Sequence, residues 1–257
     1  MEFLLYIASG ALVGLIVGIT GIGGGALMTP LLLMFGFPPH IAVGTDLMYA
    51  ALTKAGGAYS HHKQQHVNWP LVKLLALGSI PAALITGTAL KTLFEDSEQY
   101  AILLSNALGG MLLITAVVIL FRSRIQRWSA THVSNRFSQY RGVSTWLMGV
   151  FLGVFVTLSS VGAGAIGTAI LMLLYPTLRA TNVVGTDIAH AVPLTLAAGL
   201  IHMYLGNVDF SLLGALLLGS LPAIHLGSRL SRRMPEQWLK PILASLLFTL
   251  GAKYAFF

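Results

Sequence analysis

Long apolar runs fill most of this sequence and constrain its fold more than any other feature. A helix needs about 20 mostly apolar residues to cross a bilayer. Only 9% of the residues are charged, against about 25% in a typical soluble domain, so too little charge is available to cover a water-facing surface. The sequence therefore predicts an all-α, polytopic membrane helix bundle that has the lipid bilayer around it. The apolar runs are 3–20, 26–36, 41–60, 70–90, 100–121, 143–160, 165–175, 183–204, 210–230 and 237–256.

Two of the ten runs, 26–36 and 165–175, are too short to span a bilayer alone. Each follows a glycine-dense stretch, Gly21 to Gly25 in one case and Gly162 to Gly164 in the other. Short, glycine-interrupted segments at matching positions are typical of broken or re-entrant helices in transporters. We expect about eight full spanning helices plus these two short helices, which either cross or turn back.

The two halves of the chain resemble each other. A shift of 141 positions superimposes Gly44-Thr45-Asp46 on Gly185-Thr186-Asp187, His61 on His202 and Pro81 on Pro222, and a shift of 139 aligns Gly25 with Gly164. Chance matches apolar letters easily, but it rarely matches aspartate, histidine and proline in one register. We therefore divide the chain into a first membrane repeat over 1–121, an Arg-rich linker over 122–142 and a second membrane repeat over 143–257.

Charge predicts the orientation of the halves. The segment 122–141 carries five arginines and no acid, so the positive-inside rule assigns it to the cytoplasm. The same rule accounts for the net charge of +7 without nucleic acid as a partner. With each apolar run counted as one crossing, the equivalent turns 61–69 and 202–210 lie on opposite sides of the membrane. The repeats are then inverted, as in many secondary transporters.

Ionisable residues inside apolar runs are the first candidates for function. Asp46 and Asp187 are equivalent in the repeat, and carboxylates at such positions usually face the bundle interior. The alternative is an N-cap, in which the side chain accepts hydrogen bonds from the first helical amides. Lys54 follows Asp46 by about two helical turns, near the same face. It either attracts an anion or snorkels to the interface.

Histidines and glycines complete the predicted site. His61 and His202 match in the repeat and His190 shares a helix face with Asp187, so these three could relay protons beside the aspartates. Each histidine has the alternative of a structural hydrogen bond, and we expect no metal site at the turn that contains His61. Glycine clusters expose backbone amides at helix N-termini, which attract anions. The predicted substrate-binding residues are Gly23, Gly24, Gly25, Gly162, Gly164, Thr45, Thr186 and Lys54.

Several functions lack their usual motifs. The chain has no cysteine, which excludes thiolate metal sites and cysteine nucleophiles. It also lacks a Walker-type phosphate loop and a nucleophile elbow. We therefore expect no cofactor and no enzymatic activity, and any active transport would draw on an ion gradient.

The sequence resembles the TauE/SafE family of sulfite-exporter-like membrane proteins over nearly its whole length. The resemblance rests on the glycine-rich opening up to Gly25, on Ala42 to Thr45, on Gly185 to His190, and on Gly206 to Asp209. It implies an inner-membrane carrier of small anions such as sulfite or the organosulfonate sulfoacetate. Proton coupling through the aspartates and histidines is a hypothesis, and a homodimer is a candidate assembly. The alternatives are an anion channel and, in other classes, a membrane assembly factor or an intramembrane enzyme.

Overall fold

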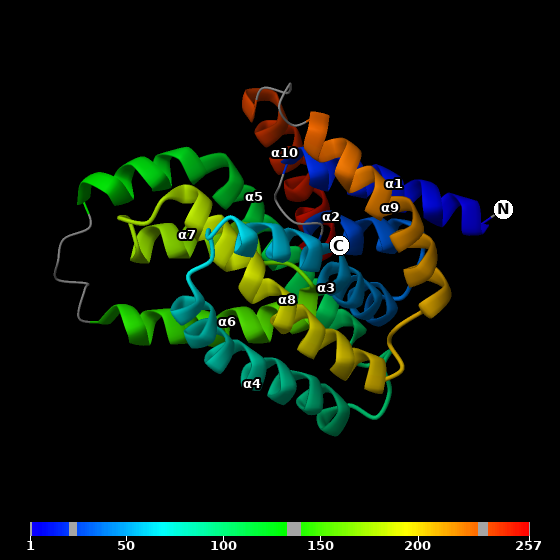
Figure 1. The fold of residues 1–257 in the computed structure, drawn as a ribbon. Helices are drawn as coiled ribbons and strands as arrows, with labels where there is room; N and C mark the ends of the chain where they lie inside the picture. Colours follow the sequence, from blue (N-terminus) through cyan, green and yellow to red (C-terminus); the bar gives the residue numbers. More distant parts are fainter. Residues whose placement is uncertain (1, 21–24, 133–139, 231–235, 257) are drawn as a thin grey trace.

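The computed structural model describes residues 2–20, 25–132, 140–230 and 236–256, and these residues form helices and no strand (Figure 1). This confirms the all-α prediction. Each of the ten helices coincides with one predicted apolar run. The helices are α1 (Glu2–Thr20), α2 (Gly25–Met34), α3 (Pro39–Lys63), α4 (Trp69–Leu93), α5 (Ala101–His132), α6 (Arg141–Ser159), α7 (Ala165–Leu174), α8 (Ala180–Tyr204), α9 (Phe210–Leu230) and α10 (Glu236–Phe256).

Five of these helices are long and apolar enough to cross a membrane, namely α4, α5, α6, α8 and α9. The protein is therefore a multi-pass membrane protein. Helix α3 is also 25 residues long, but its apolar character is interrupted by Asp46 and Lys54. Helices α2 and α7 have 10 residues each, which corresponds to about 15 Å, roughly half of the hydrocarbon thickness. The predicted number of eight full spans stays a prediction.

The Arg-rich segment is partly helical. Helix α5 continues to His132, eleven residues beyond the predicted end of its apolar run. The reason is that residues 122–132 contain no glycine or proline to stop the helix. The next seven residues, 133–139, lie outside the described part of the chain, and α6 begins at Arg141.

Helices of the two halves pack on one another in a repeating pattern. Helix α1 packs on α9, and its equivalent α6 packs on α4, while α3 packs on α8 and α5 on α10 (Figure 1). Glycines permit these close approaches. A methyl group on Gly14 would lie 2.7 Å from the Cα atom of Ser220, and one on the equivalent Gly153 would lie 2.9 Å from that of Ser79. The contact in one pair thus has a counterpart in the other.

Helices α3 and α8 run antiparallel. Gly57, late in α3, faces Ile188, early in α8, and Gly199, late in α8, lies against Met48, early in α3. Helices α5 and α10 are antiparallel as well, because Gly109 meets residues 254 and 255 whereas Gly251 meets Leu113. In each pair, a helix of the first half packs against its own equivalent from the second half.

Matching turns end α3 and α8. His66 donates its backbone N–H to the His61 carbonyl oxygen over 2.9 Å, and the equivalent bond in the second half, from residue 207 to residue 202, has the same length. Both turns contain one left-handed residue, Gln65 with φ 57° and Gly206 with φ 77°. This is the Schellman geometry, which normally selects glycine at that position.

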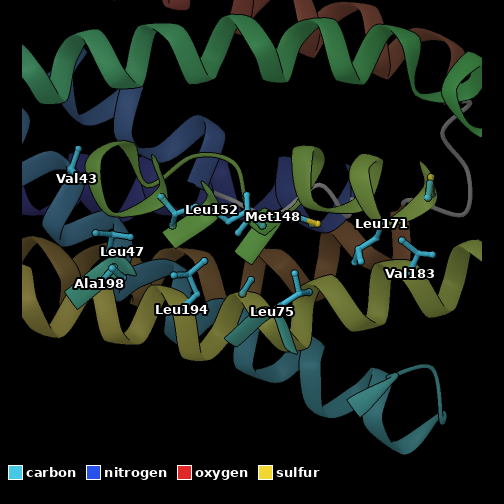
Figure 2. Close-up of a cluster of buried hydrophobic side chains, with 14 residues drawn as sticks. Val43, Leu47, Leu75, Met148, Leu152, Leu171, Val183, Leu194 and Ala198 are labelled. Atoms are coloured by element: carbon cyan, nitrogen blue, oxygen red, sulfur yellow. The ribbon is translucent and has the colours of Figure 1, made fainter. Parts of the chain in front are cut away.

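An apolar core packs against the inner side of α8 (Figure 2). Leu194 and Ala198 of α8 are fully buried, as are Leu47 of α3, Leu75 of α4 and Leu152 of α6. Helix α8 therefore contacts helices of both halves. Asp46 of α3 and Asp187 and His190 of α8 are buried within the bundle, whereas Tyr59 and Tyr204 on the same helices are exposed.

Candidate functional site

Asp46 and Asp187 lie inside the bundle, with 0% and 1% of their surface exposed. Neither caps its own helix, because the cap positions of α3 and α8 are Pro38 and Arg179. The N-cap alternative is therefore wrong for both aspartates. Each lies near the eighth residue of its helix, about 10 Å from the helix start, where a charge is buried within the bundle.

Each aspartate instead contacts the short helix of its own half. Asp46 accepts two hydrogen bonds from Thr29 of α2, one from the backbone N–H over 3.2 Å and one from the hydroxyl. Asp187 packs against Gly167 of α7, where any side chain would overlap its carboxylate, and lies beside the Gly164 amide. The N-terminal parts of both short helices thus face a carboxylate of the chain itself.

Lys54 lies between the two aspartates and is 7% exposed. Its ammonium group donates a hydrogen bond to the carbonyl oxygen of Ala163 over 3.3 Å, and it is close enough to interact electrostatically with both carboxylates. The Ala163 carbonyl belongs to the loop before α7. Lys54 therefore joins the first half of the chain to the second, and it does not snorkel to an interface.

The two carboxylates stand at different levels of the bundle. Asp187 precedes Ile188, which faces Gly57 of α3. Gly57 is eleven residues beyond Asp46, or roughly 16 Å along the helix axis. Lys54 lies within this interval. We call the three residues Asp46, Lys54 and Asp187 the charged centre.

Several polar atoms of this region have no hydrogen-bond partner although they are buried. They include the Oδ1 atoms of Asp46 and Asp187, the Nδ1 atom of His190 and the hydroxyl of Ser160, which stands near Asp46 without meeting hydrogen-bond geometry. Buried polar atoms in native structures are nearly always satisfied, so each exception needs an explanation. Here they offer places for a proton or a ligand.

The predicted glycines lie partly in this region. Gly162 and Gly164 precede α7 with φ angles of 124° and 130°, which L side chains rarely adopt. Their conformation places the Ala163 carbonyl between them, where it meets Lys54. Gly25 is the first residue of α2, and Gly23 and Gly24 lie outside the described residues.

Thr45 and Thr186 connect the two halves. The Thr45 hydroxyl accepts a hydrogen bond from the backbone N–H of Asp209 over 3.1 Å, and the Thr186 hydroxyl accepts one from that of Asn68 over 3.0 Å. Asn68 and Asp209 are equivalent under the 141-residue shift, so the two bonds are reciprocal. Both hydroxyls contact the turns of the opposite half, and their predicted role in substrate binding stays a prediction.

The three predicted relay histidines occupy different surroundings. His190 is buried near Lys54, and its Nε2 atom lies 2.8 Å from the Ser79 hydroxyl. His61 lies at the end of α3 against Gly185 and has its closest ring contact with His66. His190 is therefore associated with the charged centre, whereas His61 contacts Gly185 and His66.

His202 belongs to a separate buried network. Its Nε2 atom lies 2.9 Å from the Thr157 carbonyl oxygen, and its Nδ1 atom lies 3.2 Å from the amide nitrogen of Asn207. Since a carbonyl only accepts and an amide nitrogen only donates, His202 is neutral with its proton on Nε2. Asn207 also donates to the Tyr100 hydroxyl over 2.8 Å. The arrangement is that of a structural hydrogen-bond network.

Two neighbours of the charged centre escape sequence reasoning. Arg122, counted there as part of the linker, is close enough to interact electrostatically with Asp187. Tyr49 is fully buried, lies within electrostatic reach of Asp46 and has its hydroxyl near that of Ser220. Tyr49 is the counterpart of His190 under the 141-residue shift, so the repeat contains a signal for it. No comparable signal exists for Arg122.

Comparison with known proteins agrees with this architecture. Residues 6–254 match the family described as sulfite exporter TauE/SafE. The probable membrane transporter protein YjnA of Bacillus subtilis is 40% identical over 253 residues, covering 96% of this chain and 97% of its own. YdhB of the same organism, also named a probable membrane transporter protein, is 30% identical, covering 92% and 96% of the two chains.

A relative of lower identity also matches over nearly the full length of both chains. A probable membrane transporter protein of Methanocaldococcus jannaschii is 28% identical, covering 97% of this chain and 96% of its own. No solved structure gives a significant match. The match over nearly the whole chain, together with a multi-pass bundle that buries a charged centre, shows that the chain belongs to the TauE/SafE sulfite exporter family of membrane transporters.

Proposed function

We propose that this protein is a secondary transporter that carries a small oxyanion through the charged centre. Sulfite, which the family description names, is the first candidate, and organosulfonates such as sulfoacetate are the next. The observation that carries the proposal is the buried ammonium group of Lys54, held at 3.3 Å from a backbone carbonyl oxygen. An anion that binds there replaces a weak neutral partner by a full opposite charge.

The surroundings of Lys54 favour an oxyanion over a cation. The loop before α7 contains two glycines with positive φ, and the N-terminus of α7 carries the positive end of its helix dipole. The Ser160 hydroxyl is buried without a partner and supplies a further donor. Cationic substrates would face Lys54 directly and be repelled.

Proton coupling through Asp46 and Asp187 follows from the same geometry. Both carboxylates are buried and keep one oxygen without a partner, so each has a position for a proton. His190 is the histidine nearest to this chemistry, since it neighbours Lys54. The other titratable or charged side chains facing the two aspartates are those of Tyr49 and Arg122.

The antiparallel packing supports two inverted repeats. Helices α3 and α8 are equivalent in sequence and run in opposite directions through the bundle. If both cross the bilayer, the halves have opposite orientations, as the charge pattern predicts. We therefore assign Asp46 and Asp187 to opposite sides of the midplane, in an inner membrane with the Arg-rich segment 122–141 on the cytoplasmic side.

The test is uptake of labelled sulfite, sulfoacetate and thiosulfate into liposomes that hold the purified protein, with and without a pH gradient. A carrier gives saturable flux and counterflow of at least one of these anions, whereas an open channel gives neither saturation at low concentration nor counterflow. If no anion moves under either condition, the proposal is refuted and a different solute or an assembly role takes its place.

A further inference from the structure

The charged centre contains one cation and two carboxylates, and this imbalance has a consequence for transport. We infer that the protein carries a singly charged anion together with one proton, so that each transport step is electroneutral. The inference rests on the proposed function and adds the charge class of the substrate and the proton stoichiometry. It is carried by charge counting at buried residues.

The count begins with the cost of burial. Lys54, Asp46 and Asp187 are 7%, 0% and 1% exposed, and an unbalanced charge in such surroundings costs several kcal/mol. With Lys54 charged and both aspartates ionised, the centre carries a net charge of −1. The neutral resting state has one carboxylate ionised and the other protonated. The unpartnered Oδ1 atoms of Asp46 and Asp187 provide the position for that proton.

The count continues with the substrate. A monoanion that binds to Lys54 adds one negative charge, so the centre returns to neutrality when the remaining carboxylate takes up one proton from the same side. Lys54 then exchanges its carboxylate partner for the substrate. A dianion would leave the centre at −1 even with both aspartates protonated, so the inference favours hydrogen sulfite among the candidate substrates and disfavours thiosulfate and fully ionised sulfoacetate. After reorientation, the anion and the proton leave together and the resting state is restored.

Other charged groups do not alter this balance. His190 neighbours Lys54, but a second buried cation beside the ammonium group would be repelled, so it enters the count as neutral. Tyr49 is a buried phenol and is neutral as well. Arg122 lies on α5 and is only partly buried, so water that reaches its guanidinium group screens its charge more than that of the buried Lys54.

The position of the carboxylates fits the exchange. Asp46 and Asp187 stand at opposite ends of an interval of roughly 16 Å that contains Lys54. Both carboxylates are within electrostatic reach of Lys54, so one of them can hold the resting proton while the other takes up and later releases the proton that accompanies the anion.

The experiment measures equilibrium accumulation in proteoliposomes with the membrane potential clamped by potassium and valinomycin. The probe is labelled methanesulfonate, which is a monoanion over the whole working range of pH. The expected result is tenfold accumulation on the alkaline side for each pH unit, unchanged between −100 and +100 mV. Movement of the anion without a proton would instead give an accumulation ratio that changes about 50-fold for each 100 mV of membrane potential and does not depend on the pH gradient. That outcome overturns the inference while leaving anion transport intact.

Two variants sharpen the test. The double variant Asp46→Asn with Asp187→Asn keeps Lys54 charged but has no carboxylate to protonate, so the methanesulfonate that it moves should no longer accumulate in response to a pH gradient. Accumulation that still rises tenfold per pH unit in this variant would overturn the inference. Lys73→Met on the exposed face of α4 is the matched control for a charge change. The unmodified protein decides the stoichiometry by itself, so a misfolded variant does not leave the question open.

Discussion

Replacing Lys54 by methionine tests the charged centre most directly. Methionine has nearly the same length and removes only the charge and the hydrogen bond to Ala163. At about 4 Å from an anion and an effective dielectric constant near 20, the lost attraction is about 4 kcal/mol. Part of it is offset because Asp46 and Asp187 can then both be protonated. We therefore expect kcat/KM for anion transport to fall by roughly two to three orders of magnitude.

The assay is initial-rate counterflow of labelled sulfite in proteoliposomes at matched protein density. Lys73→Met is the control, because Lys73 is exposed on α4 and loses the same charge at the surface; its kcat/KM should stay within about twofold of the parent protein. Lys54→Arg keeps the charge but replaces a compact ammonium by a planar fork, so we expect partial activity. A Lys54→Met protein that is folded and retains more than a tenth of the parent kcat/KM would refute the role assigned to Lys54.

Further predictions concern turns, packing and the buried network. Gln65→Gly should stabilise the protein by about 1 kcal/mol, because Gln65 has a left-handed conformation that glycine adopts without strain. Gly206→Ala should destabilise the protein by a similar amount. The midpoint of thermal unfolding should therefore rise by about 2–4 °C in the first variant and fall by as much in the second. Gly167→Ala should abolish transport, since its methyl group would displace the neighbouring carboxylate, while Gly214→Ala, which has open space, should transport normally in the same flux assay. Tyr100→Phe should cost about 1 kcal/mol of stability in thermal unfolding and leave the pH profile of transport unchanged; a shifted profile would contradict a structural role for that network.

The sequence predicts the helices well because each apolar run has its own physical reason to be a helix in lipid. Length alone separates the short α2 and α7 from the spanning helices. The end of α5 is less predictable, because charge marks where a helix leaves the hydrocarbon and does not stop the backbone from continuing to His132. Gln65 is a similar case, since a glycine at the equivalent position 206 signals the turn in only one half of the chain.

The sequence predicts the charged residues of the centre but not their partners. Asp46, Lys54 and Asp187 attract notice because a charge in an apolar run needs a reason. The partner of Lys54 is a backbone carbonyl 109 residues away, which no local pattern indicates. The histidines show that a match in the repeat can also predict a shared role that the structure does not support. The match between His61 and His202 in the repeat predicts a shared role, but the structure gives His202 a neutral structural network and leaves His61 at the end of α3.

The structural contacts of the molecule follow the repeat, whereas the residues of the charged centre do not all follow it. The reciprocal bonds of Thr45 and Thr186 and the matching turns after α3 and α8 obey the relation between the halves. Lys54 does not, because its counterpart Thr195 bonds a carbonyl of its own helix over 2.8 Å. His190 and its counterpart Tyr49 also differ. If the halves exchange conformations during transport, the symmetric contacts are the ones that can be exchanged without loss. Lys54 has no equivalent lysine in the second half of the chain, so both conformations must bind the anion at the same ammonium group. One anion is therefore transported in each cycle.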